Sequence, residues 1–234
     1  MIFRQCYDDI SSTFTYLVAD EFSDKAILVD PVNHKVEQYI QLLKELNLNL
    51  DATLETHLHA DHYSGSGLLH QKTGCKMMIG EQSQISINCE RFKDDDILTL
   101  GALNIKTLHT PGHTDDSYCF LLKDRVLTGD TLLIRGTGRT DFQNGSASLQ
   151  YKNIHEKLFS LPDDTRVYPG HDYKGMTVSS IGEEKRFNPR LSHKNKQQYV
   201  ELMNELNLPY PKMIDKALPF NKSLGLSLIK SQEK

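Results

Sequence analysis

Seven side chains that can bind a metal ion lie in four short segments of this sequence. The first segment reads His-Leu-His-Ala-Asp-His at 57–62, and Pro-Gly-His, Thr-Gly-Asp and Pro-Gly-His-Asp follow at 111–113, 128–130 and 169–172. The seven are His57, His59, Asp61, His62, His113, Asp130 and His171. Imidazole and carboxylate groups suit Zn, Fe or Mn, whereas structural zinc and iron–sulfur sites are rich in thiolates. A set larger than four predicts either two metals or one metal with further residues around its ligands, and in both cases chemistry.

Glycine precedes three of these residues, at positions 112, 129 and 170. Because glycine adopts backbone conformations that other residues avoid, we expect a tight backbone beside each ligand. A lone histidine is more often a hydrogen-bonded structural residue than a ligand. The recurrence of the pattern in four segments, each after a predicted strand, favours the metal centre over that alternative.

Composition limits the function classes. With 234 residues, 38% hydrophobic and 25% charged, the chain is predicted to be globular, with one domain over 1–234 and a short helical extension from about 186. It contains no apolar run long enough to span a membrane, so no membrane partner is expected. The net charge of −4 and the lack of a basic run argue against a nucleic-acid partner.

The expected compartment follows from the cysteines and the first residues. Four cysteines are scattered without a Cys-x-x-Cys pair and are expected to be reduced. Arg4, Asp8 and Asp9 interrupt the region where a signal peptide needs an apolar stretch. We therefore expect a cytoplasmic protein, with residues 231–234 frayed.

Hydrophobic spacing predicts a sheet-rich, helix-punctuated chain. The predicted strands are two in a hairpin over 13–30, then 51–56, 75–79, a pair over 97–108, a hairpin over 117–127, and 166–168. The predicted helices are 36–46, 62–72 ending at Gly74, 147–160 and 194–206. Strands and a helix precede both His57 and His171, so the order predicts an α+β fold, a four-layer αββα sandwich with the ligands on strand-end loops at one rim.

These motifs resemble the metallo-β-lactamase superfamily, whose fold is this αββα sandwich, from about Phe14 to Leu218. The resemblance implies two metal sites that share a bridging Asp130. The first would be formed by His57, His59 and His113, and the second by Asp61, His62 and His171. Such a pair of metals suits hydrolysis, because metal-bound water is a nucleophile near neutral pH.

A narrower set of motifs is similar to the persulfide dioxygenases of the ethylmalonic-encephalopathy-protein type. It comprises residues 132–143, His155-Glu-Lys, His171-Asp-Tyr and Asn188-Pro-Arg. This resemblance implies one Fe(II) per subunit with O2 as co-substrate. The expected reaction converts a thiol persulfide such as glutathione persulfide to sulfite and free thiol, a step of sulfur metabolism and hydrogen sulfide detoxification.

The same resemblance assigns roles to the candidate residues. His57, His113 and Asp130 would hold the iron, a triad that leaves positions open for substrate and dioxygen. Four further residues would be catalytic, namely His59, Asp61, His62 and His171. Three would anchor the carboxylates of the thiol carrier, namely Arg139, Tyr173 and Arg190. An equally weighted alternative is that Arg139 pairs internally with Asp141.

The resemblance also suggests partner proteins, and the chain differs from many relatives at two sites. Some relatives carry a fused rhodanese-type sulfurtransferase domain, for which this chain is too short, so we expect a functional link to a separate sulfurtransferase, together with self-association as a homo-oligomer. Asp115-Asp116 stands where many relatives have Pro-Gly, which makes the turn after His113 more acidic. Thr137 replaces a frequent cysteine that is not an expected ligand.

Two other functions compete with the dioxygenase. A thioesterase of the glyoxalase II type, with two metals, shares all seven ligands, but residues 135–142 and the brief C-terminal region disfavour it. A non-enzymatic metal-binding or persulfide-sensing module is disfavoured because no ligand is replaced.

Overall fold

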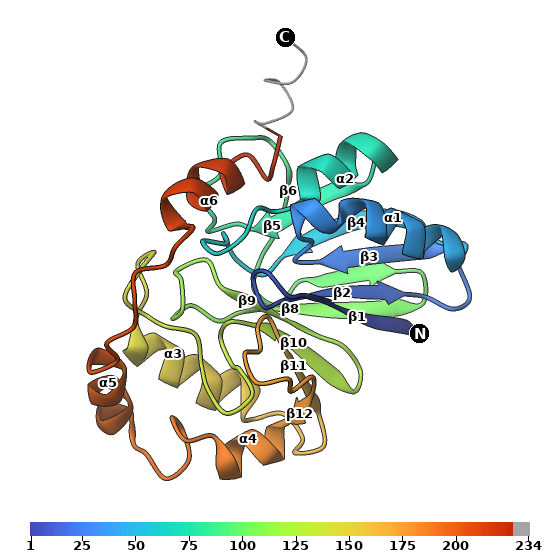
Figure 1. The fold of residues 1–234 in the computed structure, drawn as a ribbon. Helices are drawn as coiled ribbons and strands as arrows, with labels where there is room; N and C mark the ends of the chain where they lie inside the picture. Colours follow the sequence, from blue (N-terminus) through green and yellow to red (C-terminus); the bar gives the residue numbers. More distant parts are fainter. Residues whose placement is uncertain (227–234) are drawn as a thin grey trace. The chain divides into compact units, whose positions relative to one another are not determined.

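The computed structural model describes residues 1–226, and its strands form two six-stranded sheets (Figure 1). Its residue contacts divide the chain into two compact units. Unit 1 comprises residues 1–92, 98–104 and the described part of 210–234, and unit 2 comprises 93–97 and 105–209. The single domain expected from the sequence stays a prediction. No helix among residues 1–226 is long and apolar enough to cross a membrane.

The sheet of unit 1 places its strands in sequence order from β1 to β6. Its strands are β1 (Ile2–Asp8), β2 (Thr13–Ala19), β3 (Lys25–Val29), β4 (Asn49–Glu55), β5 (Lys76–Gly80) and β6 (Glu90–Phe92). The pairs from β1 to β3 are antiparallel and those from β3 to β6 are parallel. Because parallel neighbours end at the same edge, β3 and β4 deliver the residues that follow them to one place.

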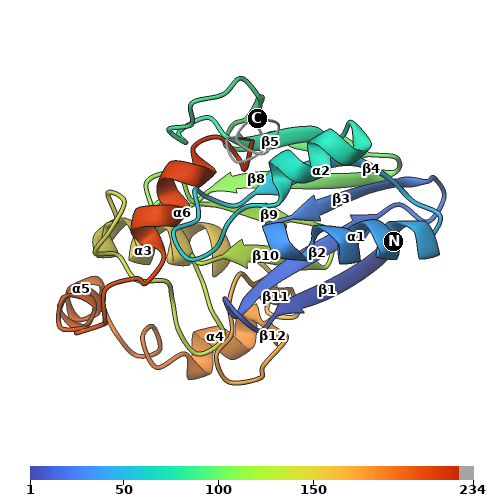
Figure 2. The same cartoon turned by 45° about the horizontal axis from the view of Figure 1, so that its top comes forward.

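Four helical segments accompany this sheet in unit 1. Unit 1 contains the short 3₁₀ helix η1 (Asn33–Lys35), α1 (Val36–Glu45), α2 (Ser66–Thr73) and α6 (Ile214–Asn221). Helices α1 and α2 lie side by side over the sheet in both views (Figures 1 and 2). Leu17, Leu28 and Leu69 are fully buried in the core between helices and sheet.

Unit 2 contains most of the second sheet, ordered β12-β11-β10-β9-β8-β7. Its strands are β7 (Ile97–Leu100), β8 (Leu103–His109), β9 (Tyr118–Leu121), β10 (Arg125–Gly129), β11 (Arg166–Pro169) and β12 (Ser179–Ser180). Its helices are α3 (Ala147–Asn153), which continues as the π-helix η2 (Ile154–Leu158), α4 (Ile181–Phe187) and α5 (Lys196–Asn204). Strands β10 and β11 are parallel, so Asp130 and the residues after β11 leave the sheet at the same edge.

The structure confirms most predicted elements and corrects the start of one helix. The helix predicted from residue 62 begins at Ser66 in the structure, although it ends at Gly74 in the left-handed conformation, as predicted. Residues 62–65 cannot be helical, because Val32 pairs with Ser64 as a β-bridge and the Gly65 amide donates to the Pro31 carbonyl. The predicted ligands at 57–62 therefore lie in a loop.

Several short elements were not predicted, namely β1, β6, β12, α4 and α6. The apolar stripe of the helix predicted over 194–206 packs in the core through Tyr199 and Met203, as expected. The four cysteines are free, also as expected. The end expected to be frayed, residues 231–234, lies outside the described residues.

We expect Leu28→Ala to lower the free energy of unfolding by about 2–5 kcal/mol, because it leaves a cavity in the unit 1 core. Leu149→Ala removes the same atoms from a side chain that is 45% exposed and should cost less than about 0.5 kcal/mol. Urea denaturation followed by circular dichroism measures both. Equal losses in the two variants would contradict the assignment of Leu28 to the core.

Candidate metal centre

The buried carboxylate of Asp30, directly after β3, organises the loop that follows β4. Its Oδ1 accepts from the Thr56 amide at 2.7 Å, and its Oδ2 accepts from the Thr56 hydroxyl at 2.8 Å. Oδ1 also lies 3.0 Å from Nε2 of His59. Asp30 adopts a left-handed conformation with φ 51°, and its amide donates to the Leu54 carbonyl. Asp30 thus fixes both the start and the middle of the loop.

Thr56 sets the tautomer of His57. Nδ1 of His57 lies 2.9 Å from the Thr56 hydroxyl oxygen. Because the hydroxyl proton goes to Asp30, that oxygen accepts, and Nδ1 of His57 must donate. The remaining nitrogen, Nε2, keeps a lone pair, which is the form of imidazole that binds a metal.

His59 and His62 each turn one buried nitrogen away from protein partners. Nε2 of His59 faces Asp30 and, at 3.2 Å, Glu55, while Nδ1 of His62 lies 2.9 Å from Oδ2 of Asp61. Within the described part of the chain, Nδ1 of His59 and Nε2 of His62 have no hydrogen-bond partner. One ligand atom each from His59, Asp61 and His62 lie within 4.8 Å of one another. Buried polar atoms without partners are costly, so this group fits a bound cation.

The charges around His59 favour the same conclusion. Burial disfavours its charged form, but the carboxylates of Asp30 and Glu55 outweigh this cost and raise the pKa of His59 well above its usual value. Glu55 is itself buried and accepts from the hydroxyls of Ser64 and Ser66. The two carboxylates therefore stabilise positive charge in this loop, whether proton or metal ion.

Unit 2 brings His113, Asp130 and His171 together at the ends of β8, β10 and β11. Nδ1 of His113 donates to the Arg139 carbonyl at 2.6 Å, which leaves Nε2 with a lone pair. Nε2 lies 3.6 Å from Oδ2 of Asp130. Oδ1 of the same carboxylate lies 2.7 Å from Nδ1 of His171. Both histidines thus contact the carboxylate of Asp130.

Glycines allow this close approach, as predicted at two positions. Gly129 has φ 48°, and a Cβ on Gly170 would lie 2.8 Å from Oδ1 of Asp130. The sequence reasoning missed Gly138, where a Cβ would lie 2.4 Å from the Asp130 carbonyl oxygen and 2.8 Å from Nδ1 of His113. A side chain at Gly138 or Gly170 would collide with a predicted ligand, and one at Gly129 would be strained by the left-handed backbone.

Glu184, which the sequence reasoning missed, holds the segment 132–143 from helix α4. This fully buried carboxylate pairs with the guanidinium of Arg135 and accepts from the Arg135 amide at 2.9 Å. Asn188 donates to Glu184 at 2.8 Å and to the Gly136 carbonyl at 3.0 Å. Glu184 belongs to no sequence motif, so nothing in the sequence indicated its role here. Asn188 belongs to the motif Asn188-Pro-Arg, but the motif does not indicate which groups Asn188 contacts.

The predicted substrate residues differ in their surroundings. Arg139 makes two hydrogen bonds to Asp141, at 2.6 and 2.7 Å, so the internal pairing considered from the sequence is present. Arg190 is partly buried and donates to the Thr137 carbonyl at 2.7 Å. Tyr173 is 72% exposed, and its ring lies parallel to that of His171 at 6.0 Å. Their binding role stays a prediction.

The acidic turn after His113 is satisfied internally. The Thr114 hydroxyl donates to Asp116 at 2.6 Å, and the Asn144 amide group donates to Asp115 at 2.8 Å. The departure at these two positions thus leaves a closed, hydrogen-bonded turn. At the other departure, the Thr137 hydroxyl lies 3.0 Å from the Tyr199 hydroxyl.

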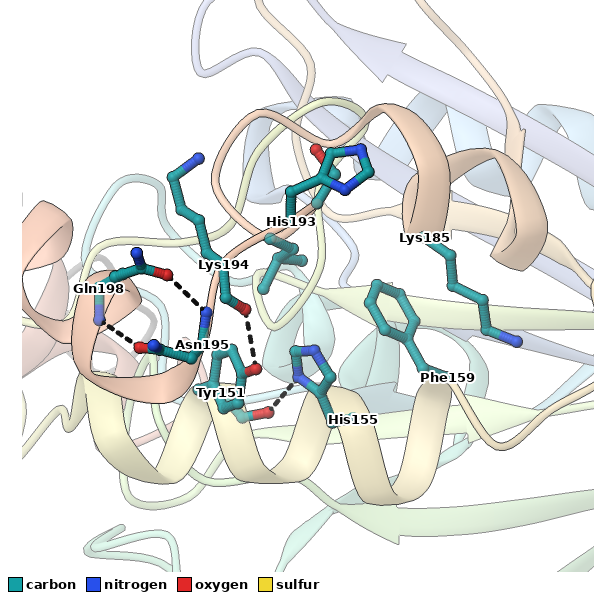
Figure 3. A pocket seen from close by; sticks show the side chains of 10 residues that line it. Tyr151, His155, Phe159, Lys185, His193, Lys194, Asn195 and Gln198 are labelled. Carbon is teal, nitrogen blue, oxygen red and sulfur yellow. Dashed lines mark hydrogen bonds between the residues drawn. The ribbon is translucent and has the colours of Figure 1, made fainter.

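A cavity of about 570 Å³ in unit 2 contains none of the predicted site residues (Figure 3). It is lined mainly by α3 with η2 and by the segment before α5. Its polar groups are largely paired with protein: Lys185 with Asp163, Lys194 with the Pro189 carbonyl, and Asn195 with Gln198 in a capping box. The prediction that the chemistry takes place at the histidine groups is therefore kept.

We expect Thr56→Val to weaken metal binding by about 10- to 100-fold, because Nδ1 of His57 loses its acceptor. Thr53→Val, the same change three residues earlier in β4, is the control, since the Thr53 hydroxyl donates to the Lys76 carbonyl, at 3.5 Å, and to no other group among residues 1–226. Competition with a coloured chelator measures the affinity. Equal affinity of the two variants would show that the Thr56 hydroxyl does not orient a ligand.

Comparison with known proteins identifies the family. The family model of the metallo-β-lactamase superfamily matches residues 9–83 and 79–171. The human mitochondrial persulfide dioxygenase ETHE1 is 44% identical over 229 residues, which cover 97% of this chain and 89% of the relative. The bovine protein of the same name is 43% identical with the same coverage.

Solved structures of the same superfamily have the same fold as this chain. The crystal structure of ETHE1 from Myxococcus xanthus superposes with a TM-score of 0.94 at 49% identity, covering 96% of this chain and 100% of the other. A metallo-β-lactamase from Staphylococcus aureus gives 0.89 at 27% identity, covering 96% and 72%.

The predicted α+β metallo-β-lactamase fold is thereby confirmed. Family membership and the group formed by His59, Asp61 and His62 indicate that the protein uses a metal. These relatives favour the dioxygenase over the glyoxalase II alternative. The chain belongs to the metallo-β-lactamase superfamily and, within it, to the family of the ETHE1 persulfide dioxygenases.

Proposed function

We propose that this enzyme oxidises the outer sulfur of a low-molecular-weight thiol persulfide, with glutathione persulfide as the preferred substrate. In the balanced reaction, one persulfide, one O2 and one water give one thiol, one sulfite and two protons. The 44% identity to a persulfide dioxygenase over 97% of the chain supports this reaction. The enzyme would act in sulfur metabolism, in the removal of hydrogen sulfide.

We assign one iron ion per subunit to His57, His113 and Asp130. Both imidazoles use Nδ1 for a protein acceptor, which supports ligation through Nε2. Iron held by two imidazoles and one carboxylate leaves positions for substrate and dioxygen and supplies redox chemistry that zinc lacks.

The single observation that carries the one-metal proposal is the hydrogen bond between Nδ1 of His171 and Oδ1 of Asp130, at 2.7 Å. This bond occupies one carboxylate oxygen, so Asp130 would hold a metal through the other, Oδ2. A carboxylate that bridges two metals, as in the hydrolase alternative, would have to give up this partner or share the same oxygen. The hydrogen bond therefore supports a terminal Asp130 and one metal.

The remaining histidines would handle protons. The reaction releases two protons for each sulfite, and a closed site needs groups that accept them. Nδ1 of His59 and Nε2 of His62 are buried and have no hydrogen-bond partner among the described residues, and Asp61 holds His62 through its Nδ1. We propose that His59 and His62 transfer these protons. Asp61 would orient His62, and His171 would orient Asp130.

Among the proposed substrate anchors, the surroundings favour Arg190. The charge of Arg139 is already matched by Asp141. Burial disfavours the charged form of Arg190 and lowers its pKa, so an anionic partner would stabilise this guanidinium more than that of Arg139. We propose that Arg190 meets a carboxylate of the thiol carrier, with Arg139 and the exposed Tyr173 at the edge of the site.

The proposal extends to the setting of the enzyme. We propose a cytoplasmic location, although the human and bovine relatives are named as mitochondrial proteins. The proposal also includes self-association as a homo-oligomer and a functional link to a sulfurtransferase that forms or passes on the persulfide.

We expect His57→Ala, His113→Ala and Asp130→Ala each to abolish iron binding and oxygen uptake, because each removes one of three ligands. The protein is loaded anaerobically with Fe(II), dissolved oxygen is followed after addition of glutathione persulfide, and sulfite is assayed at the end. The exposed His193, changed to Asn, which suits its left-handed backbone, is the control. Near-normal iron content in all three alanine variants would refute the assignment. Thioester cleavage by a zinc-loaded sample without oxygen uptake would establish the hydrolase instead.

Arg190→Ala should raise KM for glutathione persulfide by about 10-fold or more and leave the iron content unchanged, because one charged hydrogen bond is lost. Arg186→Ala, on the exposed side of α4, is the matched control. Steady-state oxygen uptake at varied persulfide concentration measures KM. An unchanged KM would remove Arg190 from the substrate site.

A further inference from the structure

The carboxamide of Asn221, at the end of α6, is bonded entirely to the loop that carries His59, Asp61 and His62. Its Nδ2 donates to the carbonyls of His59 and His62, both at 2.8 Å. Its Oδ1 accepts from the Ser64 amide, also at 2.8 Å. The side chain is 1% exposed, so these bonds are shielded from water. One side chain thus satisfies three backbone groups within six consecutive residues.

The segment around Asn221 is shaped to the same loop. The Phe220 ring lies 4.5 Å from that of Tyr63. The Gly67 amide donates to the Leu224 carbonyl at 2.6 Å. Gly225 is left-handed with φ 89°, and a Cβ there would lie 2.8 Å from the Ser64 carbonyl oxygen. Close backbone contact on both sides of Asn221 leaves the loop little freedom to shift while the C-terminal segment is in place.

We propose that Asn221 is a positioning residue, which fixes the backbone from His59 to Ser64 and thereby the direction of the Asp61 and His62 side chains. The activity of the enzyme would then depend on α6, although α6 carries none of the predicted ligands. For its kinetic consequence this inference rests on the proposed function. We call the three hydrogen bonds of Asn221 to this loop the clamp. His57 is fixed separately, through Thr56 and Asp30, so loss of the clamp should disturb the residues around the iron but not the binding of the iron itself.

Asn221→Asp is the sharpest test, because it keeps the shape and the acceptor for Ser64 but replaces both donors with a carboxylate oxygen. That oxygen would face the His59 and His62 carbonyls, which repel it. We expect kcat to fall by about 10- to 100-fold, with iron content and KM unchanged. Protonation of the buried carboxyl restores one donor, so the ratio of variant to wild-type kcat should rise as the pH is lowered. A residue that only supports the fold would lower the iron content together with kcat.

Two controls separate positioning from stability. Ser223→Ala removes a hydrogen bond of 2.8 Å to the Phe220 carbonyl within the same segment. Asn204→Asp makes the same chemical change at an exposed position of α5. Both should keep wild-type kcat. Asn221→Ala serves as a second variant that adds no charge.

Hydrogen–deuterium exchange gives a readout that does not depend on activity. Peptides covering 57–67 should exchange faster in both Asn221 variants, and at the wild-type rate in both controls. Wild-type kcat in both Asn221 variants, or an equal loss of kcat in Ser223→Ala, would overturn the proposal. If the wild-type enzyme consumes no oxygen, the proposed function fails, and the exchange decides alone: faster exchange at 57–67 supports the clamp and unchanged exchange refutes it.

Discussion

The buried carboxylate of Asp30 is the interaction on which the candidate ligands of unit 1 depend. A buried charge is tolerated only when it is well hydrogen-bonded, and Asp30 accepts from the amide and hydroxyl of Thr56 and from His59. Its left-handed backbone costs about 1–2 kcal/mol in a residue other than glycine. The bonds that this conformation permits offset the cost, because they fix two histidines through one group.

In unit 2 a candidate ligand is oriented by different means. His113 is oriented by a backbone carbonyl, that of Arg139, rather than by a carboxylate. The position of this carbonyl depends on the segment 132–143, which Glu184 and Asn188 anchor from α4. In His57 of unit 1 and His113 of unit 2, one imidazole nitrogen is hydrogen-bonded to the protein and the other is left with its lone pair. This division of labour between the two nitrogens makes a neutral histidine a ready ligand before any metal arrives.

The sequence was sufficient for the fold class, the family and most elements, because these rest on local patterns. The hairpin over 13–30 and the helix over 36–46 have clear periodicity, and both are present. The helix start was misplaced at 62 because the β-bridge of Ser64 to Val32 is a long-range contact. The metal roles of the seven ligands stay predictions that rest on motif spacing.

The groups that orient the ligands could not be predicted in this way. Glu184 and Asn221 are isolated polar residues in elements whose short helical patterns gave no signal. Their partners lie 49 and up to 162 residues away along the chain. Asp30 stands directly after a buried strand and before a proline, a position where a carboxylate is often functional. Its spacing in the sequence did not predict that Thr56 and His59 would be its partners. Long-range hydrogen bonds to backbone leave no periodic trace in a sequence.

The length of the reach from Asn221 to its loop has a consequence for biosynthesis. Within unit 2, the hydrogen bonds of His113 and His171 to Arg139 and Asp130 span 26 and 41 residues, so they can form soon after that stretch leaves the ribosome. The loop of unit 1 must wait for α6, translated 157 to 162 residues later. A nascent chain therefore displays the histidines of this loop well before the loop acquires its final shape. A chain cut before the last turn of α6 would keep every predicted ligand and still lack a finished loop.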